Sequence, residues 1–481
     1  MLNKVKINYI YNVAYQILLI IVPFITAPYI SRVLGAEKIG EYSYANSIVY
    51  YFILFAALGT ATFGRREISY FQDNISERSK KFWQTEIISC CSVLIFTVIY
   101  FIFIRYNRLP ILYYIFSIDI ISVAFDISWL FQGLEEFKKI VFRNFISKIL
   151  NIVYIFTFVK DSSDLNIYVF GLSILTFCSN ISLWVCTKKI IEKPNFKELE
   201  LLKAVKPIVH LFIPTIAVFI SSSIDKTMIG IFCENPLQNG YYEQSMKTIR
   251  IILTLITAMS TVLSPRIGFL FQKNDTNKIK KIIKQSYEFI FFLGFPICFG
   301  LISLADIFIP WFYGYEFIEA VPIVMILSFL TIFISFNNVT GTQYLIPLKK
   351  QKQYTFTVTF GSLINILLNL LLIPKFYAVG AAIASVISEF SITIMQIIVC
   401  RKEIVFKQIF IKNIPYIISS FIMLIILYCL HFIFPVSTLS LIILVLLGIF
   451  IYIVSLMIIK NNIVYEYIIK IMNSKFRKNK V

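Results

Sequence analysis

Apolar runs of about 20 residues recur along the whole length of this chain, each long enough to cross a bilayer as an α-helix. A strand of a membrane barrel would need only about ten alternating residues, so the run length predicts helices. We therefore expect an all-α integral membrane protein with about 14 transmembrane helices. The expected spans are 8–31, 39–61, 84–104, 111–132, 141–160, 165–187, 207–233, 241–265, 287–312, 321–346, 354–374, 377–400, 414–434 and 437–459.

The Lys and Arg residues lie mostly on one side of these spans. The connections on the side of the two termini hold most of the 45 basic residues. Because the positive-inside rule places basic connections in the cytoplasm, we expect a multi-pass protein with both termini cytoplasmic. The same bias explains the net charge of +19, so we expect membrane lipids, and no nucleic acid, as partners. The opposite connections hold Arg32, Lys38, Arg105, Arg108, Lys160 and Lys375.

The sequence positions of the cysteines and histidines indicate structural roles. Nearly all eight Cys lie in apolar runs and none forms a CxxC pair, while His210 and His431 are far apart. These positions are typical of small core hydrophobes, and they predict neither a disulfide framework nor a metal site. We expect no cofactor.

Two of the expected spans together hold three basic residues: Lys226 in 207–233, and Lys247 and Arg250 in 241–265. A cation at membrane depth costs about 2.5 kcal/mol or more, so it needs a watery cavity, a counter-ion or an anionic cargo. Their presence predicts a cationic, water-accessible hollow for an anionic substrate.

The second of these spans has one polar face. Glu243, Lys247 and Arg250 follow at i, i+4 and i+7, which stacks their side chains on the same side of a helix. We predict that Lys247 and Arg250 hold the anionic group, since Arg binds phosphate with two donors and Lys acts as a point charge. The alternative is a structural Glu243–Lys247 pair with Arg250 reaching the interface.

Lys226 and Arg32 each have two possible interpretations. Asp225 and Lys226 are adjacent and point about 100° apart, which predicts an ionic latch to another helix or, for Lys226, a contact with cargo. Arg32 ends the first span on the outer side, where it either guides the cargo or snorkels to the interface.

Carboxylates in or near apolar runs predict a role in gating or ion coupling. Asp119 and Asp126 are seven positions apart and are expected to share a helical face, and Asp306 and Glu389 lie farther along the chain. Membrane carboxylates carry protons or sodium in some transporters, so coupling to either gradient is a hypothesis. A structural partnership with a buried cation is the alternative.

The chain also contains a faint internal repeat of about 200 residues. The segments 39–53 and 239–253 align, with Gly40 matching Gly240 and Tyr42 matching Tyr242. Repeats related by a pseudo-two-fold axis are a common transporter architecture, with the cargo site at their interface.

Three stretches carry a family resemblance. PFITAPYISRVLGAEKIGEYSYANSIVYYF (23–52) resembles the N-terminal signature of the Wzx-type oligosaccharide repeat-unit flippases, which are polysaccharide biosynthesis proteins. SSSIDKTMIGIF (221–232) with GYYEQSMKTI (240–249), and NVTGTQYLIPLKKQKQY (338–354), are similar to the same family. This family belongs to the multidrug/oligosaccharidyl-lipid/polysaccharide (MOP) exporter superfamily.

The resemblance implies a MATE-like fold of two pseudo-symmetric six-helix lobes, at 1–190 and 207–400, two additional helices at 414–460 and a basic cytoplasmic tail at 461–481. It also implies the function. The cargo would be an undecaprenyl-diphosphate-linked oligosaccharide, flipped by alternating access from the cytoplasmic to the outer leaflet of the bacterial inner membrane. The product would be a surface polysaccharide such as O-antigen or capsule, with polymerase machinery as a further partner.

Two other classes are alternatives. A multidrug or cation exporter on the same fold would favour a cavity rich in carboxylates, whereas the clearest intramembrane cluster here is cationic. A membrane glycan polymerase or ligase would need a sizeable polar loop, and the expected outward loops are short. We therefore expect a transporter and not an enzyme.

Overall fold

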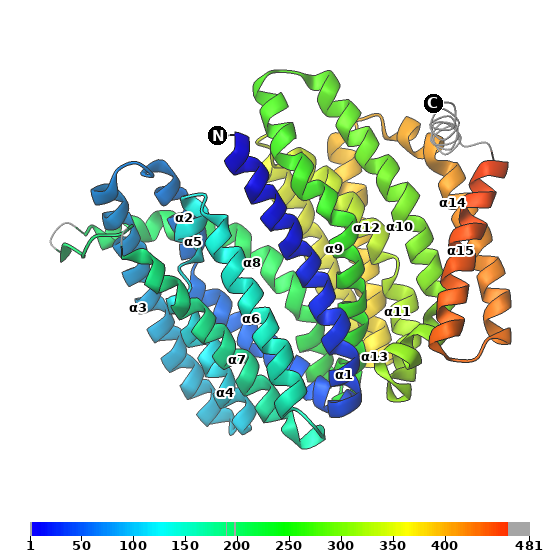
Figure 1. Cartoon of the computed structure of the whole chain (residues 1–481), viewed down its shortest axis with the longest axis horizontal. Coiled ribbons are helices and arrows are strands. Elements are labelled where there is room, and N and C mark those ends of the chain that lie inside the picture. Colours follow the sequence, from blue (N-terminus) through cyan, green and yellow to red (C-terminus); the bar gives the residue numbers. More distant parts are fainter. Residues whose placement is uncertain (1, 189, 197–198, 460–481) are drawn as a thin grey trace, which may run out of the picture. The chain divides into compact units, whose positions relative to one another are not determined.

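The computed structural model describes residues 2–188, 190–196 and 199–459, and all regular elements in these ranges are helices (Figure 1). The predicted tail at 461–481 lies outside the described residues. The helices are α1 (Leu2–Ala57), α2 (Thr60–Tyr70), α3 (Ile75–Asn107), α4 (Ile111–Ser122), α5 (Ser128–Gly133), α6 (Phe137–Phe158), α7 (Leu165–Ser182), α8 (Leu201–Phe232), α9 (Leu237–Gln272), α10 (Thr276–Tyr313), α11 (Val321–Leu327), α12 (Leu330–Asn337), α13 (Gln351–Cys400), α14 (Phe406–Leu430) and α15 (Thr438–Ile458).

In the described part of the chain, ten helices are long and apolar enough to cross a membrane, and eleven if Tyr315–Leu327 and Leu330–Leu345, bent by 43°, form one span. Two of the helices each hold two expected spans. In α1 the backbone breaks at Gly35, which has φ 75°, and in α13 it breaks at Tyr377, which has φ 53°. The predicted all-α, multi-pass membrane architecture is confirmed.

The outward helix faces carry large apolar side chains. On α3, Leu94 is 66% exposed and Ile102 is 63% exposed, and on α15 Phe450 is 65% exposed. A soluble monomer rarely leaves such broad apolar faces in water. In contact with lipid, the same apolar side chains carry no cost of exposure to water. The helical backbone there satisfies its own hydrogen bonds.

The helices form two compact units, of which the first ends at Glu243 and the second begins at Gln244. In the N-terminal unit α4 packs on α7, and α1 packs on α3 and α6. An aromatic cluster that includes Phe82, Trp129 and Phe131 joins α3 to α5. In the C-terminal unit α10 packs on α14, and α14 packs on α15. The lobe boundaries predicted from the sequence stay a prediction.

The two segments of the internal repeat cross inside the N-terminal unit, where α1 meets the first turns of α9. A Cβ atom on Gly40 would lie 1.8 Å from the carbonyl oxygen of Pro236, and one on Gly240 would lie 2.0 Å from that of Ala36. Both pairs occupy matching repeat positions, so the contact is reciprocal, as across a two-fold axis. Glycine permits this close backbone approach because it has no side chain, which explains why both aligned positions are glycine.

Candidate functional site

The N-terminal unit contains a cavity of about 520 Å³, lined by residues of α1 to α7. We call it the N-terminal cavity. On α1, Tyr42, Asn46 and Tyr50 line it at i, i+4 and i+8, so one face of the helix beyond the Gly35 break supplies aromatic and amide groups. Serine, threonine and asparagine side chains of α4, α6 and α7 add polar groups to a wall that also contains aliphatic side chains such as Ile53 and Leu172.

Two predicted carboxylates, Asp119 and Asp126, line this cavity together. Asp119 accepts a hydrogen bond from the hydroxyl of Ser173 at 2.8 Å. The prediction that Asp119 and Asp126 share one helical face is wrong, because α4 ends at Ser122 and Asp126 has extended backbone angles. The Asp126 carboxylate instead accepts from the backbone N–H of Ser128 at 3.0 Å, a local bond that competes with helix continuation.

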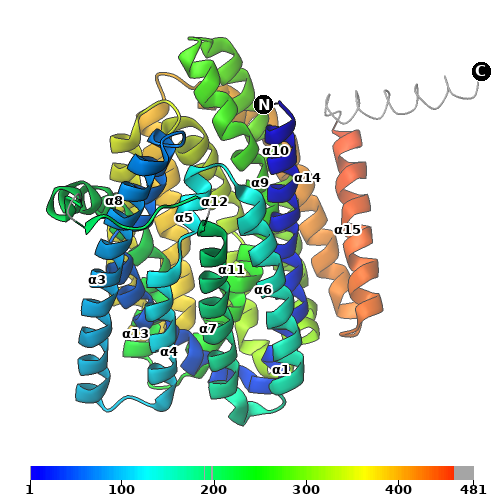
Figure 2. The ribbon, with the colours of Figure 1, turned by 60° about the vertical axis from the view of Figure 1, so that its left-hand side comes forward.

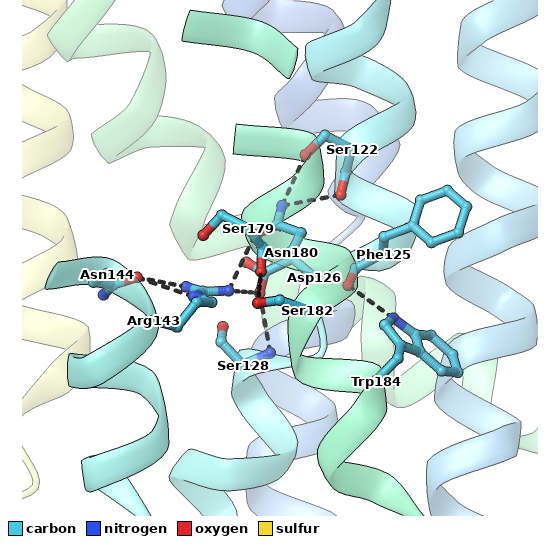
Figure 3. Close-up of polar contacts among 10 residues, drawn as sticks. All are labelled: Ser122, Phe125, Asp126, Ser128, Arg143, Asn144, Ser179, Asn180, Ser182 and Trp184. Carbon is cyan, nitrogen blue, oxygen red and sulfur yellow. Dashed lines mark hydrogen bonds and ion pairs between the residues drawn. The ribbon is translucent and has the colours of Figure 1, made fainter. Parts of the chain in front are cut away.

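A hydrogen-bonded network fixes the break between α4 and α5 (Figure 3). Arg143 on α6 lies 3.6 Å from a carboxylate oxygen of Asp126 and donates to the side-chain oxygen of Asn180 at 3.1 Å. The amide nitrogen of Asn180 in turn donates to the hydroxyl of Ser122 at 2.7 Å. Trp184 donates to the carbonyl oxygen of Phe125 at 3.0 Å. The carboxylate of Asp126 is therefore held by a cation from a second helix.

Two cations of this site, Arg143 and Lys148, were not predicted as site residues, because the positive-inside rule assigned them to a basic cytoplasmic connection. Both lie within α6, and Lys148 lines the N-terminal cavity. Among the described residues, no carboxylate lies within ion-pair distance of the Lys148 ammonium. The signal was present in the sequence, since Asn144, Lys148 and Asn151 recur at i, i+4 and i+7 on one face of α6.

The predicted latch residues Asp225 and Lys226 reach different partners, as their 100° separation implies. Lys226 on α8 forms an ion pair with Glu243 on α9. The Glu243 carboxylate also accepts from the hydroxyl of Ser43 on α1 at 3.0 Å, between positions 200 residues apart. Asp225 accepts from the hydroxyl of Tyr242 at 2.6 Å. These contacts tie α1, α8 and α9 together beside the glycine crossing.

The remaining predicted residues are not gathered into the N-terminal cavity. Arg32 is exposed on α1, before the Gly35 break. In the C-terminal unit, Lys247 is half-buried and Arg250 is exposed on α9. Glu389 on α13 accepts from the side-chain amide of Asn337 at 2.6 Å. The substrate, gating and coupling roles assigned to these side chains stay predictions.

The arrangement of helices matches the fold of solved membrane transporters. The structure of the lipid II flippase MurJ in an inward closed conformation matches with a TM-score of 0.75 and 17% identity, covering 95% of this chain and 100% of that one. An inward-facing multidrug resistance MATE transporter of the MOP superfamily matches with a TM-score of 0.56 and 15% identity, covering 82% of this chain and 94% of that one. The MATE-like fold prediction is confirmed.

The chain belongs to the polysaccharide biosynthesis protein family, whose model matches residues 5–271. The resemblance found in the sequence is thereby confirmed. A relative named "Putative O-antigen transporter" from Escherichia coli (strain K12) is 24% identical over 410 residues, covering 83% of this chain and 98% of the relative. A relative named "Probable low-salt glycan biosynthesis flippase Agl15" from Haloferax volcanii is 26% identical over 198 residues, covering 41% of each chain.

Proposed function

We propose that this protein is a flippase that moves lipid-linked oligosaccharide units across a membrane for polysaccharide biosynthesis. The observation that carries the proposal is the N-terminal cavity, whose walls bring amide, hydroxyl, aromatic and charged groups together with aliphatic ones inside a bundle of lipid-facing helices. The family and the two relatives named as a transporter and a flippase support the same conclusion.

The cargo explains why such a cavity is needed. The lipid tail of a lipid-linked glycan can stay in the bilayer, but each unsatisfied sugar hydroxyl would cost a few kcal/mol in hydrocarbon. Asn46, Tyr50 and the carboxylate of Asp119 offer the donors and acceptors that replace water around hydroxyl groups. A cavity of about 520 Å³ holds a few sugar residues at a time.

The charge of the cavity corrects one expectation and separates the two exporter classes. The N-terminal cavity is not uniformly cationic, since it carries Asp119 and Asp126 together with Lys148. Asp126 is already paired with Arg143, and Asp119 is hydrogen-bonded to Ser173. A cationic drug would meet the Asp119 carboxylate beside the Lys148 ammonium, whereas a neutral glycan with a phosphorylated end would find hydroxyl acceptors and one cation. We therefore favour the glycan over a multidrug cargo.

The finer features of the transport cycle are also part of this proposal. The carrier is undecaprenyl diphosphate, and Lys148 contacts its phosphates in the N-terminal cavity. The phosphate-binding role predicted for Lys247 and Arg250 is a separate hypothesis. The protein works in the bacterial inner membrane by alternating access, with both termini cytoplasmic, as a transporter that delivers units to a polymerase. Coupling to a proton or sodium gradient would be refuted by flipping that ignores both gradients in proteoliposomes.

The experiment reconstitutes the purified full-length protein in proteoliposomes that contain lipid-linked repeat units with a fluorescent sugar. A membrane-impermeant quencher reports how many units face outward. We expect protein-dependent equilibration of the units, and no protein-dependent accumulation of ethidium in parallel vesicles under the same gradients. Ethidium transport without glycan flipping would establish the multidrug alternative and overturn the proposal.

A further inference from the structure

A second cavity, of about 640 Å³, lies at the end of the N-terminal unit where α3 turns into α4, α6 into α7 and α8 into α9. We call it the turn pocket. The α3–α4 and α6–α7 turns are found at the same end of the unit (Figure 2). By the positive-inside prediction these turns belong to the side with few basic residues, opposite the expected cytoplasmic connections.

The wall of the turn pocket has the chemistry of a carbohydrate site. Asn166 and Asn239 supply amides, and Tyr44 supplies an aromatic ring. The ring is fixed on α8, since a Cβ atom on Gly230 would lie 2.0 Å from it. Asn239 is only 2% exposed, and among the described residues its side-chain oxygen has no hydrogen-bond partner. A buried amide oxygen without a donor is costly, at about 1–3 kcal/mol, and a water molecule or a ligand hydroxyl would supply the donor.

The charged groups of the turn pocket do not favour an ionic ligand. Lys38 and Glu41 line it together and form an ion pair of 2.7 Å, so their charges neutralise each other. Glu234 adds one carboxylate to the wall. This balance disfavours a phosphate group and suits a polyhydroxylated, uncharged ligand with apolar ring faces, which aromatic side chains and amides bind together.

An aromatic partition separates the turn pocket from the N-terminal cavity. The ring of Tyr42 lies 6.0 Å from that of Phe116 and 5.6 Å from that of Tyr168, between ring centroids. Phe116 and Tyr168 are buried. Along α7, Tyr168 stands between Asn166, which lines the pocket, and Val169, which lines the cavity. On α4, Phe116 forms part of the cavity wall itself. The two spaces are therefore consecutive compartments of one unit.

We propose that the turn pocket is a second carbohydrate subsite, which holds sugar residues of the cargo on the far side of the aromatic partition. The inference rests on the proposed flippase function, because it assigns the pocket to the same glycan. It adds a place where the sugar head is bound at the membrane face opposite the basic connections.

The test is a titration of the purified full-length protein in detergent with the free oligosaccharide, released by mild acid from the host's lipid-linked units and measured by calorimetry. We expect wild-type protein to bind it at two sites. Asn166→Leu is expected to weaken one site at least tenfold and leave the other, while Asn46→Leu in the N-terminal cavity does the reverse. Asn107→Leu, an exposed position of α3 that lines neither space, is the matched control.

The outcomes separate this inference from the proposed function. Binding that is lost in Asn46→Leu but unchanged in Asn166→Leu overturns the second subsite and keeps the flippase. No binding of the free glycan, together with active flipping in proteoliposomes, also overturns the subsite alone. If neither binding nor flipping occurs, both proposals fall. Should Asn166→Leu fail to fold, Ser163→Val at the exposed turn serves as the second variant.

Discussion

The two units of this protein use polar residues inside apolar helices in opposite ways. In the N-terminal unit such residues line an open space of about 520 Å³, and within the described part of the chain Lys148 there has no carboxylate partner. In the C-terminal unit the space among Ser260, Ser286 and Gln343 is only about 10 Å³, the size of one water molecule. The amide of Gln343 bonds to both hydroxyls, so these polar groups satisfy one another.

The surroundings of the two spaces explain the difference. The small space in the C-terminal unit lies beside an aromatic core in which Phe291, Phe295 and Phe336 pack ring against ring. Polar residues there join helices, as they do in many membrane bundles. In the N-terminal unit the break between α4 and α5 is part of the cavity wall, which includes Ser122, Val123 and Asp126. Polar groups within spans therefore do not mark a cargo site by themselves, since they line an open space in one unit and bond to one another in the other.

The largest expected effect comes from filling each space with a ring. Asn46→Phe should reduce flipping to the rate of protein-free vesicles and leave the melting temperature near that of the wild type, because the ring enters empty volume. Ser286→Phe should instead destabilise the C-terminal unit by about 1–3 kcal/mol, because the core there is already full. Thermal unfolding and the flipping assay check both variants. Equal loss of stability in both would mean that the N-terminal unit holds no usable cavity.

Replacing Lys148, the cation of the N-terminal cavity, gives the next largest effect. Lys148→Ala should slow flipping of the diphosphate-linked glycan about tenfold or more, since a charge-assisted hydrogen bond is worth about 1.5–3 kcal/mol. Lys148→Arg should restore most of the rate. Lys203→Ala, an exposed surface lysine that lines neither the N-terminal cavity nor the turn pocket, is the control. A full rate in Lys148→Ala would remove Lys148 from the phosphate site.

The helix crossing supplies a test of the repeat. Gly40→Ala should destabilise the protein by about 1–3 kcal/mol, because the new methyl group would overlap the carbonyl oxygen of Pro236. Gly240→Ala should cost a similar amount, as expected for matching positions. Gly268→Ala is the control, since its Cβ atom would meet the nearest side chain at 3.8 Å. Melting temperatures that do not distinguish the three variants would argue against the close crossing.

The smallest effect concerns a paired carboxylate of the C-terminal unit, Glu403, which lies between α13 and α14. Burial alone raises its pKa, but hydrogen bonds from Lys350 and Tyr344 outweigh burial, so the pKa is lowered from its usual value. The resulting stabilisation is present above the unfolded-state pKa of about 4.3 and is lost as the pH falls through the folded-state pKa. We expect less than about 1 kcal/mol, because the group is partly exposed.

Melting curves between pH 7 and pH 3.5 measure this contribution. The wild type should lose slightly more stability than Glu403→Gln on acidification. A variant that follows the wild-type curve throughout would show that the contact of Glu403 with Lys350 adds nothing.

Much of the fold follows from the sequence, because bilayer thickness fixes the length of an apolar span. Even the crossing of α1 and α9 had a signal, in the match of Gly40 with Gly240. The sequence did not reveal that the helix ends before Asp126, since the bond from the carboxylate of Asp126 to Ser128 leaves no mark in the apolar pattern. Local side-chain competition with the helix decided that point.

The candidate site was only partly predictable. Asp119, Asp126 and a latch from Lys226 to another helix were predicted from charges at membrane depth, and the structure places each of these side chains beside a partner. Arg143 and Lys148 were overlooked because the positive-inside rule explains a basic residue next to a connection as a cytoplasmic anchor, without any role in a site. The partner of Lys226 is on another helix, and only tertiary packing identifies it. The turn pocket had no sequence signal, because its wall comes from three separate connections.

The most direct measurement is photo-crosslinking in membranes that contain the lipid-linked units. A photoreactive amino acid at Tyr50, inside the N-terminal cavity, is compared with one at Leu94, on the lipid-facing side of α3. Our account predicts a glycan-bearing adduct at position 50 and none at position 94, identified by mass spectrometry. Active flipping with no glycan adduct at position 50 would contradict it.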